Sequence, residues 1–158
     1  FFGDVFPVPQ GLLTEVPKVP GTDGRKMSKS YGNDIRISDE PDEVVKKLKT
    51  FKTDEARQRR TDPGNPDICP FFTFHQLYSD KDTIAWVKEG CTTAGIGCLQ
   101  CKKPIIEKVL AHLEPIQKRR KELLAEKGAI WDILVKGSDR AREQAAETMA
   151  ELQKYLKL

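Results

Sequence analysis

The residues of this chain best suited to chemistry stand at positions 26–30, which read Lys-Met-Ser-Lys-Ser. The ammonium groups of Lys26 and Lys29 are compact charges with three donors each, and their hydrogen bonds to phosphate are about twice as strong as neutral ones. Two such groups on one flexible loop predict a polyphosphate site, in which Ser28 and Ser30 bind phosphate or hold the loop. A solvated basic loop is the alternative interpretation of the same residues.

Four cysteines form a second candidate site. Four thiolates suit a tetrahedral zinc ion or a [4Fe–4S] cluster, and the glycines at 90–97 let the backbone wrap tightly around an inorganic group. Zinc ribbons usually have two C-x2-C pairs, and this chain has one. Free or oxidised thiols remain a third possibility, although no secretory signal opens the sequence and cytosolic thiols stay reduced. The candidate ligands are Cys69, Cys91, Cys98 and Cys101.

Basic side chains gather after the cysteines. Residues 102–127 hold eight Lys or Arg against four Asp or Glu, although the net charge of the chain is only +3. Basic residues hold RNA phosphates and arginine planes stack on splayed bases, so this segment is a candidate RNA surface. A solvated helix face accounts for the same residues equally well. The candidate contacts are Lys102, Lys103, Arg119 and Arg120.

Mostly helical elements must position these residues. The proline-rich and glycine-rich start of the chain predicts extended backbone, with a short strand at 12–16. Apolar residues at helical spacing predict a helix that Ser38 caps, and Trp86 and Trp131 are expected in the core. Further helices are predicted at 71–78, at 82–89 with an end at Gly90, at 99–126, and from 139 after a break at 137–138.

Composition sets broad limits. Apolar residues make up 38% of the sequence and charged residues 32%, which suits a protein with one domain, or a small domain plus a fragment. No run approaches the roughly 20 apolar residues that a membrane-spanning helix needs. We therefore expect a cytoplasmic protein with no membrane partner.

Residues 20–30, Pro-Gly-Thr-Asp-Gly-Arg-Lys-Met-Ser-Lys-Ser, resemble the signature loop of class I aminoacyl-tRNA synthetases. The likeness is to the tryptophanyl and tyrosyl subgroup, and residues 6–9, 13–17 and 105–117 resemble its tryptophanyl branch. This resemblance covers nearly the whole chain and implies a mainly α carboxyl-terminal portion. Residues 1–37 would be the end of a Rossmann-type α/β catalytic domain, and residues 38–158 a helical anticodon-binding domain.

The resemblance implies ATP-dependent activation of L-tryptophan with Mg²⁺, followed by transfer from tryptophanyl-adenylate to tRNA(Trp). In that reaction Lys29 stabilises the pyrophosphate leaving group and Lys26 assists it. Met27 lies near the adenosine, while Ser28 and Ser30 shape the loop or bind phosphate. Members of the family are homodimers, and most of their tryptophan pocket lies upstream of the segment that this chain resembles.

The second signature of the class, a His-x-Gly-His type motif, is not found among these 158 residues. The only histidines are His75 and His112, and neither stands in such a motif. We interpret His75 as a packed or surface histidine. The fragment is therefore expected to be inactive alone.

The four-cysteine pattern is similar to one in a subset of bacterial tryptophanyl-tRNA synthetases that carry a [4Fe–4S] cluster near the anticodon-binding region. The first gap between cysteines is about one residue longer there. The likeness favours the cluster over Zn²⁺, in a structural or tRNA-recognition role rather than redox catalysis. Two alternatives remain for the chain as a whole: a metal-bound RNA-binding module without catalysis, and a tyrosyl-specific synthetase.

Overall fold

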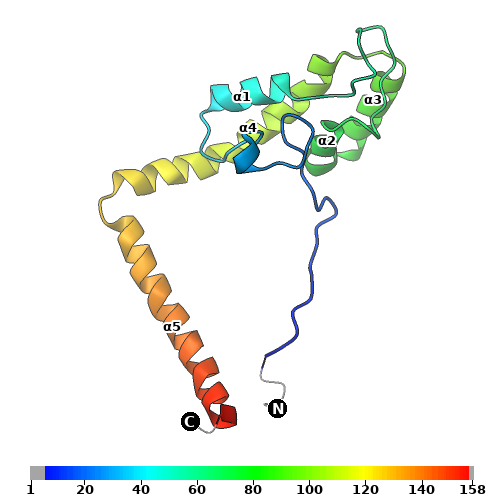
Figure 1. Cartoon of the computed structure of the whole chain (residues 1–158). Coiled ribbons are helices and arrows are strands. Elements are labelled where there is room, and N and C mark those ends of the chain that lie inside the picture. Colours follow the sequence, from blue (N-terminus) through cyan, green and yellow to red (C-terminus); the bar gives the residue numbers. More distant parts are fainter. Residues whose placement is uncertain (1–5, 157–158) are drawn as a thin grey trace. The chain divides into compact units, whose positions relative to one another are not determined.

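The computed structural model describes residues 6–156, which belong to two units. The larger unit is Leu13–Gln117, and the segment from Lys118 onward belongs to the other with the start of the chain. Helices α1, α2, α3 and the first part of α4 lie in the larger unit (Figure 1). Residues on both sides of position 37, where the sequence predicted a domain boundary, lie in that unit.

The predicted mainly α character is confirmed. Among residues 6–156, backbone pairing between extended segments is limited to one isolated antiparallel bridge, Pro20 with Lys26. The strand predicted at 12–16 is wrong: this segment has no pairing partner among the described residues, and Leu12 is 99% exposed. The helical elements are a 3-10 turn at Lys29–Tyr31, α1 at Pro41–Thr50, α2 at Phe72–Tyr78, α3 at Lys81–Thr92, α4 at Cys98–Ala125 and α5 at Ala129–Leu156.

The start of α1 differs from the prediction that Ser38 is its cap. Pro41 takes the first helical position, where its missing N–H is no loss. The preceding residues form a turn, closed by Asp39, whose Oδ2 accepts from the Arg36 backbone N–H at 2.9 Å and from Lys47 Nζ at 2.6 Å. The Asp39 carboxylate therefore organises the entry to the helix, two residues before it begins.

Helix α3 begins where a cap is available and ends later than predicted. Oδ1 of Asp80 accepts the backbone N–H of Thr83 at 2.8 Å, which satisfies one of the free donors of the first turn. The predicted end at Gly90 is wrong, because Gly90 lies inside the helix against the side chain of Ile96. A Cβ at Gly90 would stand 2.9 Å from Ile96 Cγ1, so this glycine serves close packing rather than termination.

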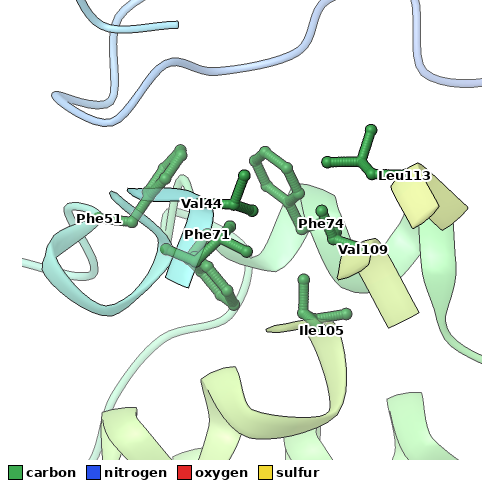
Figure 2. Packing of buried hydrophobic residues seen from close by; sticks show 8 residues of the cluster. Val44, Phe51, Phe71, Phe74, Ile105, Val109 and Leu113 are labelled. Atoms are coloured by element: carbon green, nitrogen blue, oxygen red, sulfur yellow. The ribbon is translucent and has the colours of Figure 1, made fainter. Parts of the chain in front are cut away.

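The core of the larger unit is an apolar cluster from α1, α2, α4 and the residues beside them. Figure 2 shows these side chains converging. The rings of Phe51 and Phe71 meet edge to face with centroids 5.4 Å apart, and those of Phe51 and Phe74 do so at 5.2 Å. The buried members are Val44, Leu48, Phe51, Phe71, Phe74, Ile105, Val109 and Leu113.

Helix α5 runs unbroken through Gly137, so the predicted break at 137–138 is wrong. One glycine inside a helix costs only about 1 kcal/mol relative to alanine, and α5 continues for 28 residues despite it. None of the described α5 side chains is buried, and Trp131 is 69% exposed. Trp86 on α3 is 43% exposed, so the prediction that both tryptophans lie in the core is wrong. Among the helices of residues 6–156, none is both long and apolar enough to cross a membrane.

Candidate functional site

The loop that carries the two candidate lysines is held by backbone hydrogen bonds at both ends. At its start, Gly21 N–H donates to the Arg25 carbonyl at 2.6 Å, and Met27 N–H donates to the Val19 carbonyl at 2.9 Å. At its end, Gly32 closes the 3-10 turn with φ at +66°, a backbone conformation that glycine adopts without strain. The loop is therefore a defined structure rather than a free tether.

Asn33 is the hub of this loop, and sequence reasoning missed it. The residue is 2% exposed, and its Oδ1 accepts the Ser28 backbone N–H at 2.8 Å. Its Nδ2 donates to Asp23 Oδ1 at 2.7 Å and to the Lys26 carbonyl at 3.2 Å. The only signal in the sequence was an asparagine in a glycine-flanked loop, where its amide commonly bonds nearby backbone.

The acidic group of the loop is held in its ionised form. The hydrogen bond from Asn33 lowers the pKa of Asp23 to about 2, with further lowering from Arg25, whose Nε donates to its Oδ2 at 2.7 Å. The Arg25 guanidinium also lies over the Tyr31 ring, 4.7 Å from its centroid. Asp23 and Arg25 thus neutralise one another inside the loop.

The lysines themselves remain available for a ligand. Lys26 and Lys29 are exposed, and within residues 6–156 neither ammonium is paired with a carboxylate. The hydroxyls of Ser28 and Ser30 lie 2.9 Å apart and bond to each other. The structure therefore presents two unneutralised cations on either side of an anchored segment, as a polyanion site requires.

The four predicted cysteines come from three places in the chain that the fold brings together. Cys69 precedes α2, Cys91 lies near the end of α3, and Cys98 and Cys101 occupy the first turn of α4. All four are free and half-buried, and charges on the other thiols act on Cys69, Cys91 and Cys101. In the part of the chain that the structure describes, no three His, Cys, Asp or Glu side chains converge closely enough to hold a metal ion as they stand.

Burial opposes ionisation of these thiols. It raises the pKa of Cys69 and Cys91, and it raises the pKa of Cys101 to about 12 with the help of repulsion from the other thiols. Backbone N–H groups of Asp54, Phe72 and Phe71 act on the sulfur of Cys69 in the opposite direction. A bound cation would reverse this balance, since coordinating thiols are deprotonated.

Cys91 packs so closely against position 64 that only a glycine fits there. A Cβ at Gly64 would lie 2.6 Å from Cys91 Sγ, and Gly64 N–H donates to the Cys91 carbonyl at 2.9 Å. Arg57 Nη1 lies 3.9 Å from Cys91 Sγ, and its Nη2 donates to the Ile96 carbonyl at 2.7 Å. A thiolate at Cys91 would therefore be close to a fixed positive charge.

Two buried polar residues border the cysteines. His75 has no exposed surface, as a packed histidine; its Nε2 lies 3.3 Å from Cys101 Sγ and its Nδ1 lies 3.0 Å from Ser79 Oγ. Burial lowers the pKa of His75 to about 4. Lys102 is 4% exposed, and its ammonium donates to the carbonyls of Lys49 at 2.8 Å and Phe51 at 2.6 Å.

The burial of Lys102 corrects one prediction. With its ammonium committed to two carbonyls, Lys102 does not present its charge to an RNA. The other predicted contacts, Lys103, Arg119 and Arg120, are exposed, and Arg119 pairs with Glu122 at 3.1 Å. Their role in RNA binding stays a prediction.

The sequence reading also missed a basic groove next to Cys98. This groove has a volume of about 380 Å³ and lies between residues 57–60 and 97–100. Arg60 donates to the carbonyls of Ala94 and of Gly95, the latter at 2.8 Å, so its charge is fixed against the turn before α4. A second cavity, of about 340 Å³, separates the lysine loop at Lys26 from the segment of Cys69.

The comparisons with known proteins agree with one another. The family described as tRNA synthetases class I (W and Y) matches residues 1–114. The tryptophan–tRNA ligase of Ralstonia nicotianae is 46% identical over 98% of this chain, and that of Aquifex aeolicus is 44% identical over 99%. The ligase of Thermotoga maritima is 42% identical over 99% of the chain.

A solved structure has the same fold. The crystal structure of tryptophanyl-tRNA synthetase from Campylobacter jejuni, complexed with ADP and tryptophan, aligns over 99% of this chain with a TM-score of 0.76 and 29% identity. The chain spans 49% of that protein, and 38%, 40% and 48% of the three curated relatives in the order given above. It therefore corresponds to less than half of the length of each of these proteins.

Proposed function

The chain belongs to the class I tRNA synthetases of the tryptophan and tyrosine group, and on that premise we propose that it is the ATP-loop and anticodon-binding portion of a tryptophan–tRNA ligase. The whole enzyme would activate L-tryptophan with ATP and transfer it to tRNA(Trp). The observation that carries this proposal is the pair of unneutralised ammonium groups on an anchored Lys-Met-Ser-Lys-Ser loop. Because the relatives named above are tryptophan–tRNA ligases, we propose tryptophan rather than tyrosine as the substrate of the whole enzyme.

In the proposed reaction the tryptophan carboxylate attacks the α-phosphorus of ATP. The bond to the bridging oxygen breaks and pyrophosphate leaves with that electron pair. Lys29 and Lys26 stabilise the charge that develops on the leaving group, which is the main task of a protein in such transfers. Mg²⁺, when bound, neutralises phosphate charge. A ribose hydroxyl of the tRNA then attacks the activated carbonyl, and AMP leaves.

Exchange of labelled pyrophosphate into ATP by the full-length enzyme tests this assignment. We expect the exchange to depend on tryptophan and not on tyrosine. Replacement of Lys29 by Ala should lower the rate about 10²- to 10³-fold, as loss of one charge-stabilising donor does. Lys46→Ala, an exposed lysine on α1, is the matched control. Unchanged exchange in Lys29→Ala, or exchange driven by tyrosine, would contradict the proposal.

We also propose that the four cysteines hold a [4Fe–4S] cluster, with Zn²⁺ as the alternative. The electrostatic interaction of Cys101 with the other three thiols, the close approach of Gly64 to Cys91 and the nearby cation of Arg57 support an anionic cluster with four thiolate ligands. Its contribution would be structural, because it would join the start of α2, the end of α3 and the start of α4.

Iron, sulfide and zinc analysis of protein purified without air tests this second proposal. Four iron and four sulfide per chain are expected for the intact site by its definition. Cys91→Ser should lose most of both, together with the broad visible absorption of the cluster. Stoichiometric zinc without sulfide would support the alternative, and neither metal would contradict both.

For tRNA binding, we propose contacts from Lys103, Arg119 and Arg120, which are exposed. Each contact to phosphate contributes about 0.9 to the slope of log affinity against log salt for duplexes and about 0.7 for single strands. Replacing one by Ala should lower that slope by about the same amount, whereas Lys46→Ala should leave it unchanged.

The family also favours a homodimer for the whole enzyme, which light scattering of the full-length protein would test.

A further inference from the structure

We propose that Asn33 is a positioning residue for the ATP loop, which fixes the separation of Lys26 and Lys29 through the backbone between them. This inference rests on the proposed function of those lysines. It goes further because it assigns a role to a side chain outside the pentapeptide. Asn33 carries no charge and is 2% exposed, so it acts on a ligand only through the residues that it holds.

The hydrogen bonds of Asn33 require an amide and fix its orientation. The Ser28 backbone N–H is a donor only and must face the amide oxygen, at 2.8 Å. The Asp23 carboxylate and the Lys26 carbonyl are acceptors only and must face the amide nitrogen, at 2.7 Å and 3.2 Å. No other assignment of the two amide atoms satisfies all three partners.

These bonds hold the middle of the pentapeptide. The Lys26 carbonyl and the Ser28 N–H are bound by Asn33 on either side of Met27, whose own N–H is bound by the Val19 carbonyl. Three backbone groups in a row are therefore fixed, immediately before the 3-10 turn that carries Lys29. Releasing them would let the two ammonium groups change their separation.

The residues around Asn33 pack closely against its side chain. Gly21 is buried against it, and a Cβ at Gly21 would lie 2.3 Å from Asn33 Cγ. The Thr22 backbone N–H donates to the Asn33 carbonyl at 2.8 Å, so the main chain of Asn33 is fixed as well as its amide. The two sides of the loop, at residues 21–23 and at residues 26–28, therefore both contact Asn33.

Aspartate has nearly the same shape as asparagine but the wrong chemistry for this position. A carboxylate at position 33 would still accept the Ser28 N–H. It would have no donor for Asp23 or Lys26, and it would face the Asp23 carboxylate at hydrogen-bond distance. Two like charges so close favour a shared proton, so protonation of the pair restores a donor.

This chemistry gives a test that separates positioning from folding. We would measure tryptophan-dependent pyrophosphate exchange by the full-length enzyme with Asn33→Ala, Asn33→Asp and the control Asn65→Ala. The Asn65 side chain is exposed and accepts the Asp67 backbone N–H at 3.0 Å. Asn33→Ala should lower kcat/KM for ATP by about 10²-fold, the effect of a displacement near 1 Å, with KM for tryptophan unchanged. Asn33→Asp should lose as much at neutral pH and recover as the pH falls, a recovery that Asn33→Ala lacks.

Three outcomes would overturn the inference. The first is full activity of both Asn33 variants while Lys29→Ala is impaired, in which case the proposed function stands without this role. The second is a loss in both variants that is accounted for by the fraction of enzyme that binds tryptophan, which marks a folding defect only. The third is the same pH profile for Asn33→Asp and Asn33→Ala. If Lys29→Ala is also fully active, the proposed function itself fails.

Discussion

The buried ammonium of Lys102 gives the sharpest test of how this unit is held together. Its Nζ donates to the carbonyls of Lys49 and Phe51 at the end of α1, and it lies 5.4 Å from the centroid of the Phe71 ring. Burial lowers the pKa of Lys102, while charges on Cys98, on Cys69 and on Cys101 act in the opposite direction. Replacement by Met keeps the length and the apolar stem and removes only the charged donor.

Two opposing effects set the expected magnitude. A hydrogen bond from a charged donor contributes about 1.5–3 kcal/mol, and a buried carbonyl left without a donor costs about 1–3 kcal/mol. Against this, Lys102→Met removes a desolvation penalty of several kcal/mol. Because both carbonyls stay behind without a partner, we expect the loss to prevail by about 2 kcal/mol. Lys102→Ala removes about three more methylenes at about 0.8 kcal/mol each, which brings the loss to about 4 kcal/mol.

Urea denaturation of the 158-residue chain at neutral pH measures this loss. The urea concentration at the midpoint should fall, while the slope of the free energy of unfolding against urea concentration stays the same. This combination marks a change in stability alone. The control is Lys103→Met, at the adjacent exposed position, with an expected change within about 0.5 kcal/mol. A Lys102→Met protein as stable as the parent, or more stable, would refute the reasoning, because desolvation would then outweigh the two hydrogen bonds.

Three further predictions concern the helices and glycines, and thermal or urea unfolding checks each. Ile105→Ala should lose about 2–5 kcal/mol from the core, whereas Leu99→Ala on the same helix, 66% exposed, should change little. Asp80→Ala should lower the melting temperature, and Asp80→Asn should lower it less, because Asn keeps the cap on Thr83 but loses the charge that faces Lys108. The hydrogen bonds from Thr83 hold the pKa of Asp80 below its usual range, so the Asp80→Ala deficit is full above about pH 4 and shrinks as the pH falls below it. Gly64→Ala should destabilise the chain, because its Cβ would meet Cys91 Sγ at 2.6 Å, whereas Gly137→Ala in α5 has nothing within 4 Å and should stabilise it by about 0.8–1 kcal/mol.

Sequence periodicity predicted the helices that have an apolar face to bury. The spacing of Val44 and Leu48 is that of the face of α1 that packs in the core, and α4 ends at Ala125, one residue before the predicted end at 126. These features depend on residues close in sequence, which is why the pattern alone was enough.

The failures came where tertiary contacts decide between local options. Ser38 is a good cap by type, but the Asp39 carboxylate closes a turn there instead. Gly90 is a good helix terminator by type, but contact with Ile96 makes it an interior residue. Lys102 is a surface residue by type, and only the carbonyl of Phe51 at the end of α1, 51 residues earlier in the chain, turns it into a buried donor. No local pattern carries that information.

Tertiary contacts also decide how the loop that carries Lys26 and Lys29 is held. Val19, Met27 and Ile35 pack against the apolar core, and the Lys52 backbone N–H donates to the Thr22 carbonyl at 2.8 Å. Movement of the first half of the loop relative to the helices would break these contacts together. The second half, the turn at Lys29–Tyr31, has no buried residue and is free of that cost. Under the proposed function, the exposed Lys29 side chain would adjust to a polyphosphate, while the backbone that Asn33 holds keeps the spacing of Lys26 and Lys29.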